Sequence, residues 1–393
     1  MKKYDQLADR TLHLQPEGAY AVLAKANELE SSGKRIIHLE IGQPDFQTFG
    51  NISRAGTDAI MRGETRYTPS AGIPALKKKI AEYTGNRLNM EFSPDQVVVG
   101  PGAKPLLFFP MMALLEPGDE AVYPDPGFPS YKAIIETMGA TPVPIPLREE
   151  NNFSFDMDAL ESMVNEKTRL LIINSPSNPT GGTIPEKDLQ KIASLAEKYD
   201  FWILSDEIYT RLVYSDTPVK SIAQIEGMKK RTIIMDGFSK TYAMTGWRLG
   251  YALMPESLAY KVGLLLTHSV GCTASFTQIA GIEALTGPQE QVDEVCSKFK
   301  NRRDRIVDGL NNIPGVSCLR PDGAFYVFPN IKSFGKSSAE IAEFLLDEAG
   351  VALLPGTSFG SYGEGYLRLC YATSMEEIEE ALSKIEEKLN ILN

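Results

Sequence analysis

The sequence predicts an α/β protein in which a mostly parallel sheet is covered by helices and is followed by a smaller α+β domain. Between about 95 and 255, short apolar runs typical of buried strands alternate with helical stretches such as Glu186–Tyr199. After about 285 this alternation ends, and strands and helices mix. A chain of 393 residues is too long for one core. We therefore expect an N-terminal segment (1–48) that packs with the small domain, a large domain (49–285) and a small C-terminal domain (286–393).

Periodicity and turn residues predict the individual elements. Apolar residues at helical spacing predict a helix over 16–35, ended by Ser31-Ser32-Gly33, and "IIHLEIGQPDF" (36–46) follows as a short strand. The strands expected in the large domain are 97–100, 120–124, 170–174, 201–207, 232–237 and 249–253. The elements expected in the small domain are a charged helix at Glu290–Asn311, strand-like runs at 323–330, 350–360 and 365–372, a helix at 338–349 and a terminal helix from Met375.

Composition argues against several classes of function. The net charge of -11 gives no basic footprint for nucleic acid or for an anionic membrane. The four cysteines are far apart and the three histidines lack ligand spacing, so we expect buried free thiols and no metal site. The N-terminus has no apolar signal core, and the longest apolar run, Pro105–Leu115, is too short to cross a bilayer. We expect a cytoplasmic protein.

Polar residues at strand ends indicate where a site would form. Sites in parallel sheets form at the carboxyl ends of the strands, and Asn174, Asp206 and Asp236 fall at those ends. "GPGAKP" (100–105) follows a strand and precedes an apolar helix, so its bare backbone N–H groups could bind an anion. Taken alone, it could also be an ordinary turn between a strand and a helix.

Three charged residues are candidates for chemistry, each with a simpler alternative. Asp206 ends a buried strand and would need a cationic partner, although it could be a helix-capping or surface acid. Arg368 lies on an apolar strand and suits bidentate carboxylate binding, or else a local ion pair. Lys240 follows the Ile-Ile-Met strand. If desolvated, it could form a Schiff base; if exposed, it is a solvated surface charge.

The order of these residues resembles one family. Asn178 lies in "NSPSNPTGG", Asp206 and Tyr209 lie in "SDEIY", and Lys240 lies in "GFSKTYAMTGWRLGY" ahead of Arg368. The pattern resembles the fold-type I, class I/II pyridoxal-phosphate-dependent aminotransferases, in particular bacterial aspartate/prephenate-type enzymes. The resemblance extends from "LEIGQPDF" (39–46) to Arg368 and so covers nearly the whole chain. It implies a three-layer fold around a mostly parallel sheet.

The resemblance implies a role for each matching residue. Lys240 would bind pyridoxal 5'-phosphate covalently, while Asp206 pairs with the pyridine nitrogen. Tyr209 and Asn178 would hydrogen-bond the ring oxygen, with Phe128 stacked on the ring. The phosphate would be held by Gly102, Ala103, Ser239 and Arg248, next to Lys104, and by Tyr67 from a neighbouring subunit. The substrate carboxylate would be bound by Arg368, with Gly42 and Asn178 beside it.

The implied reaction is transfer of an amino group from an L-amino acid to 2-oxoglutarate by a ping-pong mechanism in a homodimer with shared active sites. Lys104 would select substrates with a distal carboxylate, unless it is a solvent-exposed lysine at a helix start. The same residues would also suit a β-lyase or an amino-acid oxidase. A non-catalytic descendant, such as the effector domain of a regulator, is disfavoured because Lys240 is present and no DNA-binding domain is appended.

Overall fold

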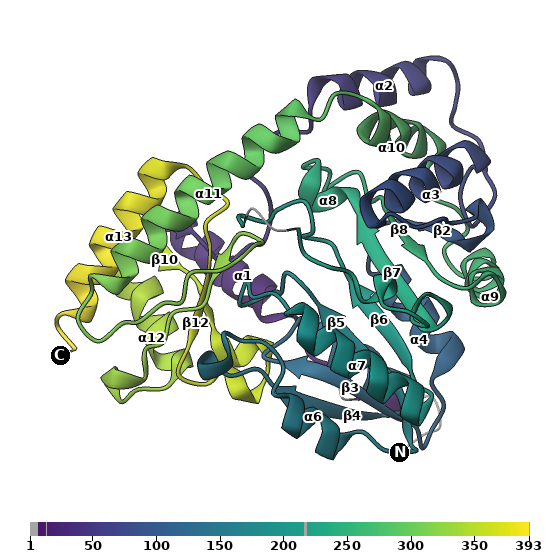
Figure 1. The fold of residues 1–393 in the computed structure, drawn as a ribbon. Helices are drawn as coiled ribbons and strands as arrows, with labels where there is room; N and C mark the ends of the chain where they lie inside the picture. The colour runs from purple at the N-terminus through teal and green to yellow at the C-terminus, as the bar shows by residue number, and fades with distance from the viewer. Residues whose placement is uncertain (1–6, 13, 216–217, 393) are drawn as a thin grey trace.

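A seven-stranded sheet forms the centre of the larger part of the molecule (Figure 1). The structure is a computed structural model that describes residues 7–12, 14–215 and 218–392. The strand order is β2-β8-β7-β6-β5-β3-β4, and every neighbouring pair is parallel except the two pairs made by β8. The strands are β2 (Val97–Gly100), β3 (Glu120–Asp125), β4 (Thr141–Pro146), β5 (Thr168–Asn174), β6 (Trp202–Asp206), β7 (Thr232–Gly237) and β8 (Gly250–Leu253).

Helices cover both faces of this sheet because its strands are apolar on both sides. Leu170 and Ile172 pack in one core with helices α4, α5 and α9, while Leu171 and Ile173 pack in a second core with α6 and α7. This alternation along β5 follows from the two-residue period of a strand. The helices of this part are α2 (Gly50–Met61), α3 (Pro74–Leu88), α4 (Pro105–Leu114), α5 (Ser130–Thr137), α6 (Met157–Met163), α7 (Glu186–Tyr199), α8 (Phe238–Thr241), α9 (Glu256–Thr267) and α10 (Ser275–Thr286).

The C-terminal part joins with the beginning of the chain. Strand β1 (Ile37–His38) pairs in parallel with β10 (Val351–Ala352), and β11-β12-β9 form a separate antiparallel sheet. Helix α1 (Gly18–Ser31) is fastened to the same part by an ion pair of Lys25 with Glu343, 2.8 Å. The remaining elements are β9 (Tyr326–Val327), β11 (Leu354–Pro355), β12 (Leu367–Cys370), α11 (Glu290–Asn311), α12 (Ser338–Phe344) and α13 (Met375–Leu389).

The structure differs from the sequence expectations in three respects. Strand β4 was not expected, because its sequence TPVPIP contains three prolines. It lies at the edge of the sheet, where proline is tolerated since one side of the strand makes no ladder hydrogen bonds. The strands expected at 36–46 and 323–330 shrink to two residues each. Of the four cysteines, Cys318 and Cys370 are buried, whereas Cys272 and Cys296 are partly exposed.

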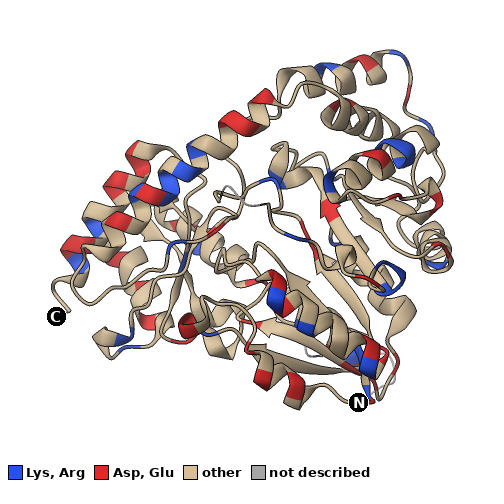
Figure 2. Ribbon diagram, viewed as in Figure 1, with Lys and Arg blue, Asp and Glu red and all other residues tan. Residues whose placement is uncertain are grey.

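Charged residues lie mainly on the outer helices, with both signs interspersed along α11 and α13, while the central strands are largely uncharged (Figure 2). Within the described part of the chain, no helix combines the length and the apolar character that crossing a membrane requires.

Candidate active site

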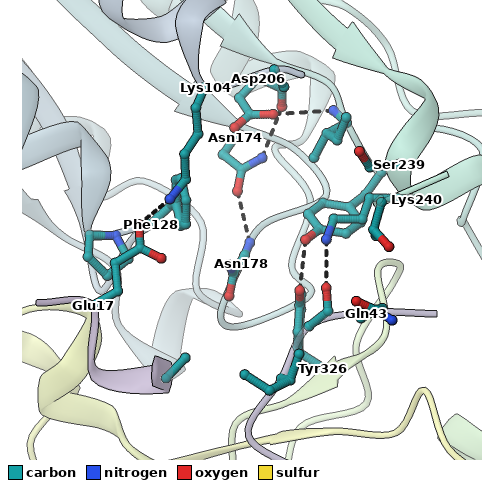
Figure 3. A pocket seen from close by; sticks show the side chains of 18 of the residues that line it. Glu17, Gln43, Lys104, Phe128, Asn174, Asn178, Asp206, Ser239, Lys240 and Tyr326 are labelled. Carbon is teal, nitrogen blue, oxygen red and sulfur yellow. Dashed lines mark hydrogen bonds and ion pairs between the residues drawn. The ribbon is translucent and has the colours of Figure 1, made fainter. Parts of the chain in front are cut away.

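A cavity of about 660 Å³ opens at the carboxyl ends of the central strands, between the large sheet and the C-terminal part. It brings together residues that lie far apart in the sequence (Figure 3). Most of the residues expected at the site line it: Gly42, Ala103, Lys104, Phe128, Asn178, Asp206, Tyr209, Ser239, Lys240, Arg248 and Arg368.

Strand register decides which of the polar strand ends face this cavity. Asn174 of β5 is in register with Asp206 of β6, and its Nδ2 donates to the Asp206 carbonyl oxygen, 3.0 Å. Asp206 is in register with Met235 of β7, which also lines the cavity. Asp236 follows Met235 and so points to the opposite face, where it accepts from Tyr251 Oη at 3.2 Å. The expectation that a site would draw on all three strand ends is therefore wrong for Asp236.

Lys240 is a partly buried, desolvated amine rather than a solvated surface charge. It lies in the short helix α8 directly after β7, and its Nζ donates to the Gly42 carbonyl oxygen at 2.6 Å. Burial lowers the pKa of Lys240 to about 8; nearby Cys370 opposes this shift, while the positive charges of Arg368 and Arg248 add to it. A lysine with this pKa is largely neutral in mildly alkaline solution and is therefore a competent nucleophile.

Asp206 is buried at the floor of the cavity. Burial raises the pKa of Asp206 to about 6, and a hydrogen bond from Tyr131 opposes that shift. Tyr131 Oη of α5 donates to Asp206 Oδ2 at 2.6 Å, and the Ile208 N–H donates to Oδ1 at 3.3 Å. The carboxyl group is thus fixed in orientation. Tyr131 was not expected at the site; its place three residues after Phe128, on the same short helical turn, was the available signal.

Two tyrosines and an asparagine form the next layer of the cavity wall. Tyr209 Oη and Tyr326 Oη share a hydrogen bond of 2.8 Å. The Asn178 backbone N–H donates to Asn174 Oδ1 at 2.8 Å, so that the Asn178 side chain remains available to a ligand. Its buried Oδ1 has no hydrogen-bond partner among the described residues. Tyr326 was not expected at the site, although the run 323–330 that contains it was expected to be a strand.

Arg368 lies on β12 and is held by its neighbours on both sides. Its Nη2 donates to the Glu40 carbonyl oxygen, and its guanidinium lies over the rings of Tyr326 and Phe359 at 4.7 and 5.0 Å. Its buried Nε has no hydrogen-bond partner within the described part of the chain. A buried donor on a fixed guanidinium is a binding point for an anionic group.

The turn between β2 and α4 packs against a second cation of the cavity, Arg248. Gly102 adopts φ +94, and a Cβ there would overlap the guanidinium of Arg248. Gly250 is equally constrained, since its Cβ would lie 2.6 Å from the Ala103 nitrogen. Helix α4 begins at Pro105, directly after this turn, so the positive end of its dipole adds to the charge of Arg248. The turn, the helix start and the arginine together suit a phosphate group.

Two residues differ from the others: Tyr67, which was expected to act from a neighbouring subunit, and Glu17, which was not expected at the site. Tyr67 is 99% exposed and does not reach the cavity of its own chain. Glu17 was not expected at the site, yet it lines the cavity and forms an ion pair with Lys104. Its position directly before a helix of unexceptional sequence gave no signal of that contact.

A sheet of this topology with a lysine of lowered pKa, a buried acid and a buried arginine around one cavity defines a class of enzyme, and comparison with known proteins agrees. The family model for aminotransferase class I and II matches residues 34–385. The chain belongs to this family and is an aminotransferase of the fold-type I group. Members of the family use pyridoxal phosphate.

Individual relatives of the chain are named for several amino acids. The chain is 41% identical to an aspartate aminotransferase of Pyrococcus horikoshii over 385 residues, 98% of this chain and 97% of the relative. It is 39% identical to a probable aspartate/prephenate aminotransferase of Aquifex aeolicus over 389 residues, 98% of each. It is also 38% identical to an aromatic-amino-acid aminotransferase of Thermococcus litoralis over 386 residues, again 98% of each.

Solved structures with the same fold are also named for different amino acids. The aspartate aminotransferase of Thermus thermophilus with maleate superposes with a TM-score of 0.93 at 34% identity, over 97% of this chain and 99% of that one. An alanine aminotransferase of Pyrococcus furiosus also reaches 0.93 at 34% identity, over 98% and 100%. The fold is therefore common to enzymes named for acidic and for neutral amino acids.

Proposed function

We propose that this enzyme transfers the amino group of an L-amino acid to 2-oxoglutarate by a ping-pong reaction, with pyridoxal 5'-phosphate bound at Lys240. The observation that carries the proposal is the Lys240 amine, with its lowered pKa, in one cavity with Asp206 and Arg368. A lysine whose pKa is lowered inside a cavity is suited to act as a nucleophile, and covalent binding of an aldehyde uses that property.

The residues present fit this cofactor at both of its ends. The Gly102 turn, Ser239 and Arg248 suit the phosphate, since a backbone without Cβ lies against a guanidinium there. Asp206 suits the protonated ring nitrogen. Among the described residues, Asn178 Oδ1 has no hydrogen-bond partner, so it can bind a polar group of the cofactor. Phe128 lines the cavity and suits stacking on the ring.

The chemistry divides between the cofactor and the chain. When bound, pyridoxal phosphate supplies an electron sink for the electron pair left at the substrate Cα. Arg368 binds the α-carboxylate and sets the orientation of the Cα–H bond. Lys240 Nζ accepts the Cα proton as a general base, for which a pKa of about 8 is well placed. Asp206, oriented by Tyr131, maintains negative charge at the far end of the cavity.

Glutamate production is the direct test of this reaction. Purified enzyme loaded with pyridoxal phosphate is incubated with an amino acid donor, with and without 2-oxoglutarate. Transfer predicts glutamate and the 2-oxo acid of the donor in equal amounts, and initial rates that give parallel double-reciprocal lines. Release of ammonia without glutamate would instead identify a lyase or an oxidase and would contradict the proposal.

We propose in addition that Lys104 reads a distal carboxylate of the substrate. The support is its position on the cavity wall at the start of α4, already paired with a carboxylate. Lys104→Ala is expected to lower kcat/KM for aspartate by about ten- to a hundredfold, the effect of one charged hydrogen bond, and that for alanine by less than about threefold. The matched control is Lys78→Ala on the exposed face of α3. Equal losses of kcat/KM for both donors would refute the proposal that Lys104 binds the distal carboxylate.

The assembly that we propose is a homodimer in which Tyr67 reaches the phosphate of its neighbour. Its side chain is 99% exposed and lies outside the cavity of its own chain, which leaves it free to do so.

We also propose that the chain divides into an N-terminal segment (1–48), a large domain (49–285) and a small domain (286–393). The pairing of β1 with β10 supports this division, because it joins the N-terminal segment to the small domain.

A further inference from the structure

Lys104 already has a carboxylate partner that belongs to the protein itself. Its Nζ forms an ion pair with Glu17 Oε1 and lies 5.3 Å from the centroid of the Phe128 ring (Figure 3). The Ser130 hydroxyl donates to the same Glu17 oxygen at 3.2 Å. Glu17 therefore lies where a substrate carboxylate would have to bind in order to contact Lys104.

Glu17 and Lys104 belong to different parts of the molecule. Glu17 directly precedes α1, whose first residue Gly18 lies so close to Ser358 that a Cβ would come within 2.5 Å of its hydroxyl. Helix α1 is also tied to the C-terminal part through Lys25, which contacts Asp347 at 3.2 Å. Lys104 lies at the start of α4 on the large sheet. The ion pair thus bridges the two parts across the mouth of the cavity.

The pair is weak enough to be exchanged. The side chains of Lys104 and Glu17 are 48% and 27% exposed, and partly exposed ion pairs contribute little net free energy. A ping-pong aminotransferase must accept two substrates in one cavity, and these can differ in charge. An unpaired cation facing a neutral substrate would be unfavourable in a closing cavity.

We propose that Glu17 is an internal substitute for the distal carboxylate of the substrate. With an acidic substrate, Lys104 exchanges Glu17 for the substrate carboxylate; with a neutral substrate, Lys104 keeps Glu17 and its charge stays compensated. Glu17 therefore sets the balance between acidic and neutral substrates. This inference rests on the proposed function, in which Lys104 reads the distal group.

Binding of two unreactive acids of the same length tests the exchange. Succinate and butyrate each offer one carboxylate to Arg368 but differ in the distal group, and their Kd values are measured calorimetrically on the enzyme loaded with pyridoxal phosphate. Glu17→Gln is expected to tighten succinate by about fourfold, the typical worth of a partly exposed ion pair, and to leave butyrate no tighter. An unchanged ratio of the two Kd values, or an equal shift of both, would overturn the proposal.

Two further variants separate the proposal from the function on which it rests. Lys104→Met should abolish the preference for succinate, and adding Glu17→Gln to it should not restore that preference. If Lys104→Met leaves the preference intact, the reading of Lys104 itself fails. If it abolishes the preference while Glu17→Gln alone changes nothing, the role of Glu17 fails. Glu28→Gln, the same change on the exposed face of α1, is the matched control.

Discussion

At the scale of the residue, burial gives Lys240 its reactivity. An exposed lysine has a pKa of about 10.4 and is almost entirely protonated at neutral pH. In this enzyme burial lowers the pKa to about 8, and the guanidinium groups of Arg368 and Arg248 shift it in the same direction. The cavity therefore partly shields the amine from water and makes it nucleophilic.

The pH dependence of cofactor binding checks this value. The nucleophile is the neutral amine, whose fraction grows as the pH rises through the pKa. The rate constant for pyridoxal phosphate binding to apoprotein, followed by absorbance, should rise with a midpoint near pH 8 and then level off. Arg368→Gln should move the midpoint to higher pH because it removes a positive charge near the amine. A rate still rising steeply at pH 10 would mean that the lysine is not desolvated.

Other residues of the site show what sequence patterns could and could not predict. Asp206 and Asp236 both end apolar strands, so the pattern treats them alike. The register of β6 with β7 places Asp206 in line with Met235 and turns Asp236 to the other face. Tyr131 reaches Asp206 from a different element, and no local pattern encodes such a contact.

At the scale of the element, strands were predicted best where they were buried and uninterrupted. Strands β5, β6 and β7 lie in the middle of the sheet, and their apolar runs match the observed bounds within about two residues. Strand β4 was missed because its prolines argue against a central strand, whereas an edge strand accepts them. The residues of a strand do not determine by themselves whether it lies at the centre or at the edge of the sheet.

The turn before α4 gives a prediction at this scale. Gly102→Ala would place a Cβ against the Arg248 guanidinium at a positive φ of +94. Since the end of an arginine side chain can move, we expect the fold to be retained and the binding of the phosphate to weaken. The Kd for pyridoxal phosphate should rise by about tenfold or more.

The matched control is Gly118→Ala in an exposed turn. Gly118 has a similar φ of +104, but no heavy atom lies within 4 Å of its Cβ position among the described residues. Both variants should lose about 1 kcal/mol of stability through backbone strain, seen as similar shifts in Tm. Equal cofactor affinities for the two variants would show that the contact between Gly102 and Arg248 is unimportant.

At the scale of the whole molecule, the site is assembled from both parts of the chain. Lys240 and Asp206 come from the large sheet, Arg368 from β12, and Gly42 from the segment that follows β1. The hydrogen bond between Lys240 and the Gly42 carbonyl oxygen spans this division. Relative motion of the two parts would therefore open or close the site around a substrate.

Subunit complementation tests whether a second molecule also contributes. Lys240→Ala and Tyr67→Ala chains are co-expressed with different tags, and hybrid dimers are isolated. If Tyr67 crosses between subunits, one of the two sites in each hybrid has both residues intact, so the hybrid should regain about half of the wild-type activity at limiting cofactor. Activity no higher than the average of the two parent variants would show that Tyr67 does not serve the neighbouring site.

The sequence by itself determined the class of fold, the family and the identity of most residues that line the cavity, because these depend on local apolar periodicity and on motifs within short segments. The tertiary structure decided which acid faces the cavity, how far the pKa of Lys240 falls, and that Glu17 meets Lys104. The physical reason is that register, burial and ion pairing depend on contacts between residues far apart in the chain. Such contacts exist only after the chain has folded.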